Sequence, residues 1–174
     1  MGYRTFLGCM AVITAVLCSE SPLVGQTPAT EEEIPTRILF VFDASNSMNA
    51  FWGKQRKWDV ARDLLAASLD SLYRIDGIEL GLRVYGHGTK HVPGKQDCDD
   101  TELIVPIGPG RNLIIQQELK KLRAQGTTPI ARSLLQAADD FERCEGPGRN
   151  VVLLITDGIE ACDEDPCAVA RALR

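Results

Sequence analysis

The sequence contains little that would attract a nucleic acid or span a membrane. It carries 19 Lys and Arg against 24 Asp and Glu, a formal net charge of -5, and its basic residues form no cluster. Proteins that bind nucleic acids neutralise phosphates with clustered basic side chains, so nucleic-acid binding is not expected. Beyond the N-terminus, no apolar run approaches the roughly 20 residues that cross a bilayer, and no repeat of about 20 to 50 residues is present. An integral transporter and a solenoid are therefore excluded.

The common catalytic motifs are also incomplete. An aspartyl phosphotransferase needs a second acid two residues after its nucleophile, but Ser45 stands two residues after Asp43. The stretch Gly88 to Lys95 resembles a phosphate-binding loop, yet its second glycine comes one residue late and Gln96 replaces the metal-binding Ser or Thr. The Gly-x-Ser-x-Gly elbow of serine hydrolases is absent. No catalytic mechanism has all its parts, and we expect the protein not to be an enzyme.

The N-terminus resembles a secretory signal. Arg4 precedes an apolar stretch from Phe6 to Cys18, and small residues follow at the spacing that a signal peptidase recognises. We therefore predict a signal peptide over residues 1–21, with Gly25 or Gln26 as alternative boundaries. The stretch is too short for a membrane anchor, so no membrane span is expected after cleavage.

A linker is predicted to follow the signal. Residues 22–36 are rich in proline and glutamate and nearly free of apolar side chains, so the folded part is expected from Arg37 onward. Lipid attachment at Cys18 is the minor alternative to cleavage, because Leu17 occupies a position where lipid-acceptor sites carry a small residue. The protein is expected to be secreted, periplasmic or exposed at the cell surface.

Cleavage would leave an even number of cysteines in an oxidising compartment, which favours disulfides. The remaining cysteines are Cys98, Cys144, Cys162 and Cys167. They allow three pairings, and their spacing lacks the paired pattern of a zinc site. We expect Cys162 to pair with Cys167 and close a small loop. Cys98 with Cys144 then follows only by elimination.

Strand and helix patterns alternate along the rest of the chain. Apolar runs predict four strands, over residues 38–42, 78–85, 103–107 and 151–155. The first and last are expected to be buried on both faces, and the second to be less buried on one face. Amphipathic spacing predicts helices over residues 58–73, 113–123 and 130–141, and a last helix is expected from residue 166. Thr128 is expected to cap the third helix, with Pro129 at its first position. The order predicts an α/β fold, a doubly wound, mostly parallel sheet with helices on both faces.

Oxygen-bearing side chains follow two of these strands. Asp43, Ser45 and Ser47 alternate after the first strand, Asp157 follows the last, and Thr128 precedes the third helix. Right-handed crossovers bring the two strand ends to one edge of the sheet, where ligands bind in such folds. Carboxylate and hydroxyl oxygens suit a hard divalent cation. We therefore predict a metal site that keeps one coordination position open for an outside ligand.

Three motifs resemble the metal-ion-dependent adhesion site of von Willebrand factor type A (VWA) domains. They are Asp-x-Ser-x-Ser from Asp43, Gly-x-Thr-Pro from Gly126 and Thr-Asp-Gly from Thr156. The resemblance covers residues 37–174, and the segment from Asp157 to Cys167 is similar to that of a branch of secreted bacterial members. It implies that Ser45, Ser47 and Thr128 bind the metal directly, and Asp43 and Asp157 directly or through water. Mg²⁺ is the expected ion, with Ca²⁺ and Mn²⁺ as alternatives. Further strands and helices follow in the family, so the C-terminal part is expected to be missing and the edge beside the last strand unpaired.

The resemblance implies an exported adhesion module whose protein partner offers a carboxylate to the metal. Two alternatives stay open, a metal-dependent hydrolase or phosphotransferase and a scaffold whose metal site is inactive. Near the same edge, Trp52 and Trp58 are either partner anchors or packing residues, and His87 and His91 are either ligand contacts or turn residues. The oligomeric state is not predicted.

Overall fold

The computed structural model describes residues 34–173. The predicted signal at residues 1–21 and residues 22–33 of the linker predicted over 22–36 lie outside the described residues. The first strand begins at Thr36, one residue before the predicted start of the folded part. A four-stranded sheet has the order β5-β4-β1-β6, built from β1 (Thr36–Asp43), β4 (Ile78–Tyr85), β5 (Thr101–Pro109) and β6 (Arg149–Ile155). β1 runs parallel to β4 and β6, whereas β5 is antiparallel to β4. The sheet is therefore mostly parallel, as predicted.

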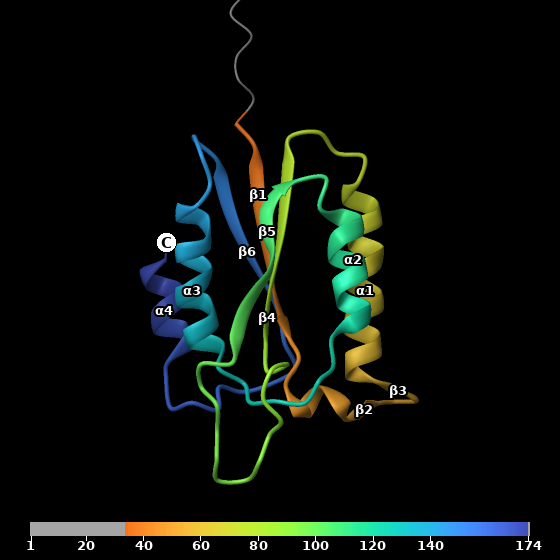
Figure 1. Cartoon of the computed structure of the whole chain (residues 1–174), viewed down its shortest axis with the longest axis vertical. Helices are drawn as coiled ribbons and strands as arrows, with labels where there is room; N and C mark the ends of the chain where they lie inside the picture. The colour runs from red at the N-terminus through yellow and green to blue at the C-terminus, as the bar shows by residue number, and fades with distance from the viewer. Residues whose placement is uncertain (1–33, 174) are drawn as a thin grey trace, which may run out of the picture. The chain divides into compact units, whose positions relative to one another are not determined.

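Two helices cover each face of this sheet (Figure 1). α1 (Lys57–Leu72) and α2 (Asn112–Lys121) lie on one side, and α3 (Ile130–Glu142) and α4 (Pro166–Ala172) on the other. A single-turn 3-10 helix, η1 (Asn46–Asn49), and a small hairpin of β2 (Phe51–Trp52) and β3 (Gln55–Arg56) connect β1 to α1. The predicted α/β architecture with helices on both faces is confirmed. No helix of the described residues is long and apolar enough to cross a membrane.

The central strand β1 divides the apolar core into two parts. Phe40 and Phe42 pack with side chains of α1 and α2, whereas Leu39 and Val41 pack with α3. All four are at most 1% exposed. Successive side chains of a strand point to opposite faces, so an uninterrupted apolar run is what a strand covered on both faces requires. Trp58 belongs to the part of the core on the α1 side, where its ring packs edge to face on the Phe42 ring with centroids 5.4 Å apart.

The neighbouring strand β4 is more buried than its alternating sequence predicts. Arg83 is only 4% exposed because its guanidinium forms two hydrogen bonds with the Asp140 carboxylate of α3, at 2.7 and 2.9 Å. Tyr85 is fully buried beside the β1 end. A buried charge is tolerated when it is paired, which accounts for a strand whose polar positions face the interior.

The edge strand β6 is less buried than predicted. Val151 and Leu153 are 43% and 42% exposed, because among residues 34–173 no element covers this strand on the α1 side and it pairs only with β1. A groove of about 900 Å³ separates β6 from α1, and it reaches the loop that carries Asp157. The opposite face of the strand, with Val152 and Leu154, packs against the α3 core, whereas on the α1 side the terminal Ile155 packs against the Phe40 and Phe42 cluster.

The disulfide differs from both predicted pairs. Cys98 is bonded to Cys162, and within the described part of the chain Cys144 and Cys167 are free thiols. The long loop between β4 and β5 and the loop after β6 both contact α3, where Arg132 lies within 3.5 Å of Asp99 and 3.3 Å of Glu164. Because both loops meet over this helix, cysteines far apart in the sequence become neighbours.

Candidate metal centre

The loop after β1 folds back on the carboxylate that ends the strand. Asp43 is fully buried, and its Oδ1 accepts a hydrogen bond of 2.7 Å from the backbone N–H of Ser45. The Oγ atoms of Ser45 and Ser47 lie 2.9 Å apart. A carboxylate and two hydroxyls at alternate positions are thus held together by the tight turn that opens η1.

The end of β6 closes this arrangement from the neighbouring strand. The Ser47 hydroxyl donates to Asp157 Oδ1 at 2.8 Å, and the Thr156 hydroxyl donates to Asp43 Oδ2 at 2.7 Å. The parallel pairing of β1 with β6, in which Phe42 lies opposite Ile155, places both strand ends at one edge. The predicted meeting of Asp43 and Asp157 at this edge is therefore observed.

Thr128 reaches the same place from the loop before α3. A Cβ atom built on Gly158 would lie 3.2 Å from Thr128 Cγ2, 3.6 Å from Asp43 Oδ2 and 3.7 Å from Ser47 Oγ. Gly158 is therefore surrounded by three of the predicted ligands, and hydrogen bonds join Ser45 and Asp157 to the same group. The structure brings all five predicted residues together.

Thr128 does not cap α3 as predicted. The helix begins at Ile130, as its predicted range has it, but Pro129 rather than Thr128 occupies the cap position and supplies no side-chain cap. Glu160 fills that role instead, since its Oε2 accepts a 2.8 Å hydrogen bond from the N–H of Ala131. The Thr128 hydroxyl is thereby released from helix capping.

Gly86 permits the close approach of these loops. It directly follows β4 and has φ +70°, and an added Cβ would lie 2.5 Å from the carbonyl oxygen of Thr127 and 2.9 Å from the backbone of Ser45. Positive φ favours glycine, and the missing side chain allows the β1 loop and the α3 loop to touch. The Asn46 N–H then donates to the carbonyl of Gly126 at 2.9 Å.

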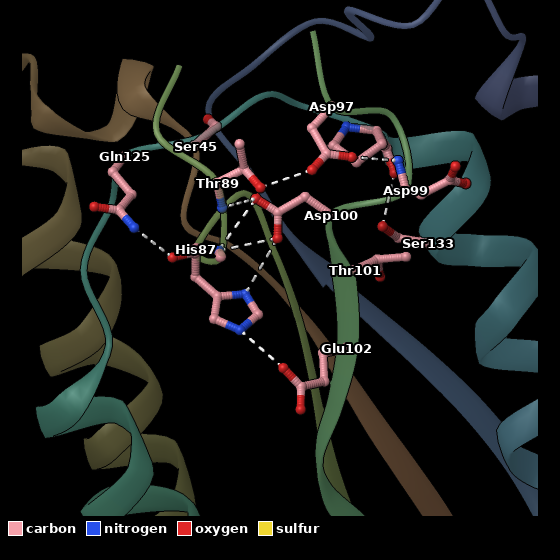
Figure 2. Close-up of polar contacts among 12 residues, drawn as sticks. Ser45, His87, Thr89, Asp97, Asp99, Asp100, Thr101, Glu102, Gln125 and Ser133 are labelled. Carbon is pink, nitrogen blue, oxygen red and sulfur yellow. Dashed lines mark hydrogen bonds and ion pairs between the residues drawn. The ribbon is translucent and has the colours of Figure 1, made fainter. Parts of the chain in front are cut away.

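The loop between β4 and β5 flanks this edge (Figure 2). The Asp100 carboxylate accepts hydrogen bonds from the backbone N–H groups of Gly88 and Thr89 at 3.0 to 3.1 Å. The His87 ring lies between two acids, 3.8 Å from Asp100 and 3.3 Å from Glu102, as Figure 2 shows. His87 therefore organises its own loop and contacts none of the five predicted ligands.

Two residues near the site were not predicted from the sequence. The Lys57 ammonium is bonded to Asp157 Oδ2 at 2.5 Å. The Tyr85 hydroxyl lies next to Asp43 and Thr156 yet is buried without a hydrogen-bond partner among the described residues. Burial, and then the negative charge of Asp43, raise the pKa of this phenol well above its ordinary value. The one signal in the sequence is a lysine directly before the helix predicted over residues 58–73, near an N-terminus where acidic residues are preferred.

The donor set fits a hard divalent cation. It consists of two carboxylates and three hydroxyls, which are the oxygen ligands that Mg²⁺ and Ca²⁺ take. Among residues 34–173, no group of three or more His, Cys, Asp or Glu side chains is placed to hold a metal. An ion at this edge would therefore depend on the hydroxyls. The ammonium bonded to Asp157 shows that the pocket already accepts positive charge.

No family model matches the chain. Two proteins of Bacillus subtilis (strain 168) are similar in sequence: YwmD is 36% identical over 148 residues, and YwmC 28% identical over 147 residues. The matches cover 84% and 83% of this chain but 65% and 64% of the relatives. The chain thus spans a little under two thirds of the length of these relatives.

Several bacterial proteins of solved structure share this fold. BatB from Bacteroides thetaiotaomicron has a TM-score of 0.60 at 23% identity, over 78% of this chain and 60% of that one. The pilus adhesin SpaC from Lactobacillus rhamnosus GG scores 0.61 at 20% identity, over 75% and 16% of the two chains. The vWF domain of the pili tip protein Mfa5 from Porphyromonas gingivalis scores 0.52 at 16% identity, over 74% and 39%. The fold is therefore VWA-like.

Proposed function

We propose that the protein is an exported, non-enzymatic adhesion module that binds a protein partner through a divalent cation. The cation is held by Asp43, Ser45, Ser47, Thr128 and Asp157. Mg²⁺ is the proposed ion, and Ca²⁺ and Mn²⁺ are the alternatives. A carboxylate of the partner completes the coordination.

The convergence of five oxygen-bearing residues at one sheet edge carries this proposal. Ser47 and Asp157 come from loops more than a hundred residues apart, yet their side chains are hydrogen-bonded at 2.8 Å. When bound, the ion would supply an electrophilic position for an outside oxygen, because neutral hydroxyls leave much of its charge uncompensated. Asp43 is placed to orient the first loop through Ser45 N–H, and Thr156 to orient Asp43.

The surroundings of the serines favour binding over catalysis. Ser45 and Ser47 hydrogen-bond to each other, and Ser47 also donates to Asp157, so among the described residues neither hydroxyl is paired with an imidazole that would activate it as a nucleophile. A pilus adhesin and a pilus tip protein among the fold neighbours also support an adhesive role. The Cys98–Cys162 disulfide favours an exported location, because disulfides persist in oxidising compartments.

Exposed aromatic side chains beside the site support a protein partner. Phe51 and Trp52, on the β2–β3 hairpin, are 68% and 72% exposed. Trp52 lines the groove that also reaches Asp157. Aromatic side chains are enriched among the residues that dominate binding energy, so a partner that places a carboxylate on the ion would find apolar contacts nearby.

The proposal is tested with an array of immobilised peptides, each with a central Asp or Glu, or Asn or Gln as the amide control. We expect Mg²⁺-dependent retention on acidic peptides only, lost in EDTA and in the Ser47→Ala variant. Asp63→Ala, which removes an exposed carboxylate of α1, is the matched control and should bind like the wild type. Equal retention in Mg²⁺ and EDTA would contradict a metal-mediated function.

A further inference from the structure

Lys57 is held beside the metal centre by both its backbone and its side chain. Its N–H donates to the carbonyl of Ala50 at 2.9 Å, which closes the hairpin that follows the Ser47 turn. Its ammonium contacts Asp157 Oδ2 at 2.5 Å, with the two side chains 32% and 13% exposed. The ion pair is therefore partly shielded from water and joins residues one hundred positions apart.

The helix itself does not explain this cation. Lys57 is the first residue of α1, where the partial positive charge of the helix N-terminus disfavours a positive side chain. The acid of the first turn, Asp59, pairs with Arg56 at 2.9 Å and Arg62 at 3.5 Å rather than with Lys57. Among the described residues, Asp157 is thus the acid that pairs with Lys57 and offsets this unfavourable position.

Lys57 also changes the charge of the site. The carboxylates of Asp43 and Asp157 give a formal charge of -2, and the ammonium reduces the net negative charge to -1. Asp43 accepts hydrogen bonds from neutral donors only, the Ser45 N–H and the Thr156 hydroxyl. On Asp157 one oxygen accepts from Ser47 and the other from Lys57. The carboxylate at the mouth of the site is therefore the one that is neutralised.

We propose that Lys57 is a tethered competitor of the divalent cation. In the metal-free protein its ammonium holds Asp157 in position, and it must release or share this carboxylate when the site is filled. Lys57 thereby keeps the empty site assembled and lowers its affinity for metal, so that occupancy depends on the cation concentration outside. This inference rests on the proposed metal centre.

The expected size of the effect follows from the charges. Removing a unit positive charge next to a divalent cation at a partly exposed site is expected to strengthen binding about tenfold, since water and salt screen most of the repulsion. A substitution that keeps the charge, Lys57→Arg, should leave the affinity near that of the wild type. A structural role alone predicts the opposite sign for Lys57→Gln, because the loop around Asp157 would loosen.

Calorimetric titration of the full chain with MgCl2 and CaCl2 tests the inference, alongside thermal unfolding in EDTA. Lys57→Gln should bind about tenfold tighter yet unfold at a lower temperature without metal, because Asp157 then lacks its partner. Lys54→Gln is the matched control: it removes the same charge from the exposed hairpin turn, where Lys54 forms no ion pair with any described residue. It should change neither property.

Two results would overturn the inference, and they are distinguishable. If wild type binds metal and folded Lys57→Gln binds equally or more weakly, Lys57 is not a competitor, and the proposed metal centre stands. If wild type, Lys57→Gln and Lys57→Arg are all folded and none binds metal, the metal centre and the competitor role both fail. Tight binding by Lys57→Gln alone would support the competitor role most strongly.

Discussion

The Cys98–Cys162 disulfide is expected to make a large contribution to stability. It joins residues with a sequence separation of 64. In the chain-entropy description, closing a loop of this length in the unfolded chain corresponds to about 4 kcal/mol. Domains of this kind are stable by about 5 to 15 kcal/mol, so losing the bond removes a large part of the free energy of unfolding.

Urea unfolding of two double variants measures this contribution. Cys98→Ser with Cys162→Ser should unfold at a clearly lower urea concentration than wild type, by about 4 kcal/mol on extrapolation to water. The matched control, Cys144→Ser with Cys167→Ser, removes two thiols without breaking the bond and should shift the midpoint little. If the first variant lost less than about 1 kcal/mol, or no more than the control, the assigned pairing would be refuted.

Three further predictions concern the buried charge, the loop junction and a free thiol. Arg83→Ala should lower the free energy of unfolding by about 3 to 5 kcal/mol, because Asp140 stays buried without its partner. A decrease below about 1 kcal/mol, measured by urea unfolding, would contradict this. Gly86→Ala should destabilise the fold and disturb the metal centre, since the added methyl meets the Thr127 carbonyl at 2.5 Å; a variant with unchanged melting temperature would refute the tight junction. Burial raises the pKa of the Cys144 thiol, so the midpoint of its iodoacetamide alkylation rate against pH should lie above the ordinary thiol value of about 8.5; a midpoint at or below that pH, followed by peptide mass spectrometry, would contradict the shift.

Helices and strands were predictable where the pattern of apolar residues within the element reflects how it is buried. The run at Ile38 to Phe42 is apolar at every position because β1 is covered on both sides, and this is visible without any structure. The antiparallel direction of β5 and the exposure of β6 were not predictable in the same way. Both depend on neighbours in the sheet rather than on the residues of the strand itself.

In the candidate site, too, local motifs were predictable from the sequence and contacts between distant segments were not. The spacing of Asp43, Ser45 and Ser47 is local and appears directly in the sequence, whereas the contact of Lys57 with Asp157 is made only by the folded chain. The disulfide was missed for the same reason, since Cys98 and Cys162 meet where two loops cross α3. Pairings of this kind follow loop paths that short-range patterns do not encode.

Isothermal calorimetry with Mg²⁺ on wild type and Ser47→Ala tests the central claim most directly. Ser47 is exposed and its hydroxyl bonds only within the site, so the variant should fold as the wild type does, which circular dichroism would verify. We predict one Mg²⁺ per wild-type chain and a loss of binding in the variant. The account would be contradicted if folded wild type and folded Lys57→Gln both bound no divalent cation, or if the Ser47→Ala variant bound Mg²⁺ with unchanged affinity.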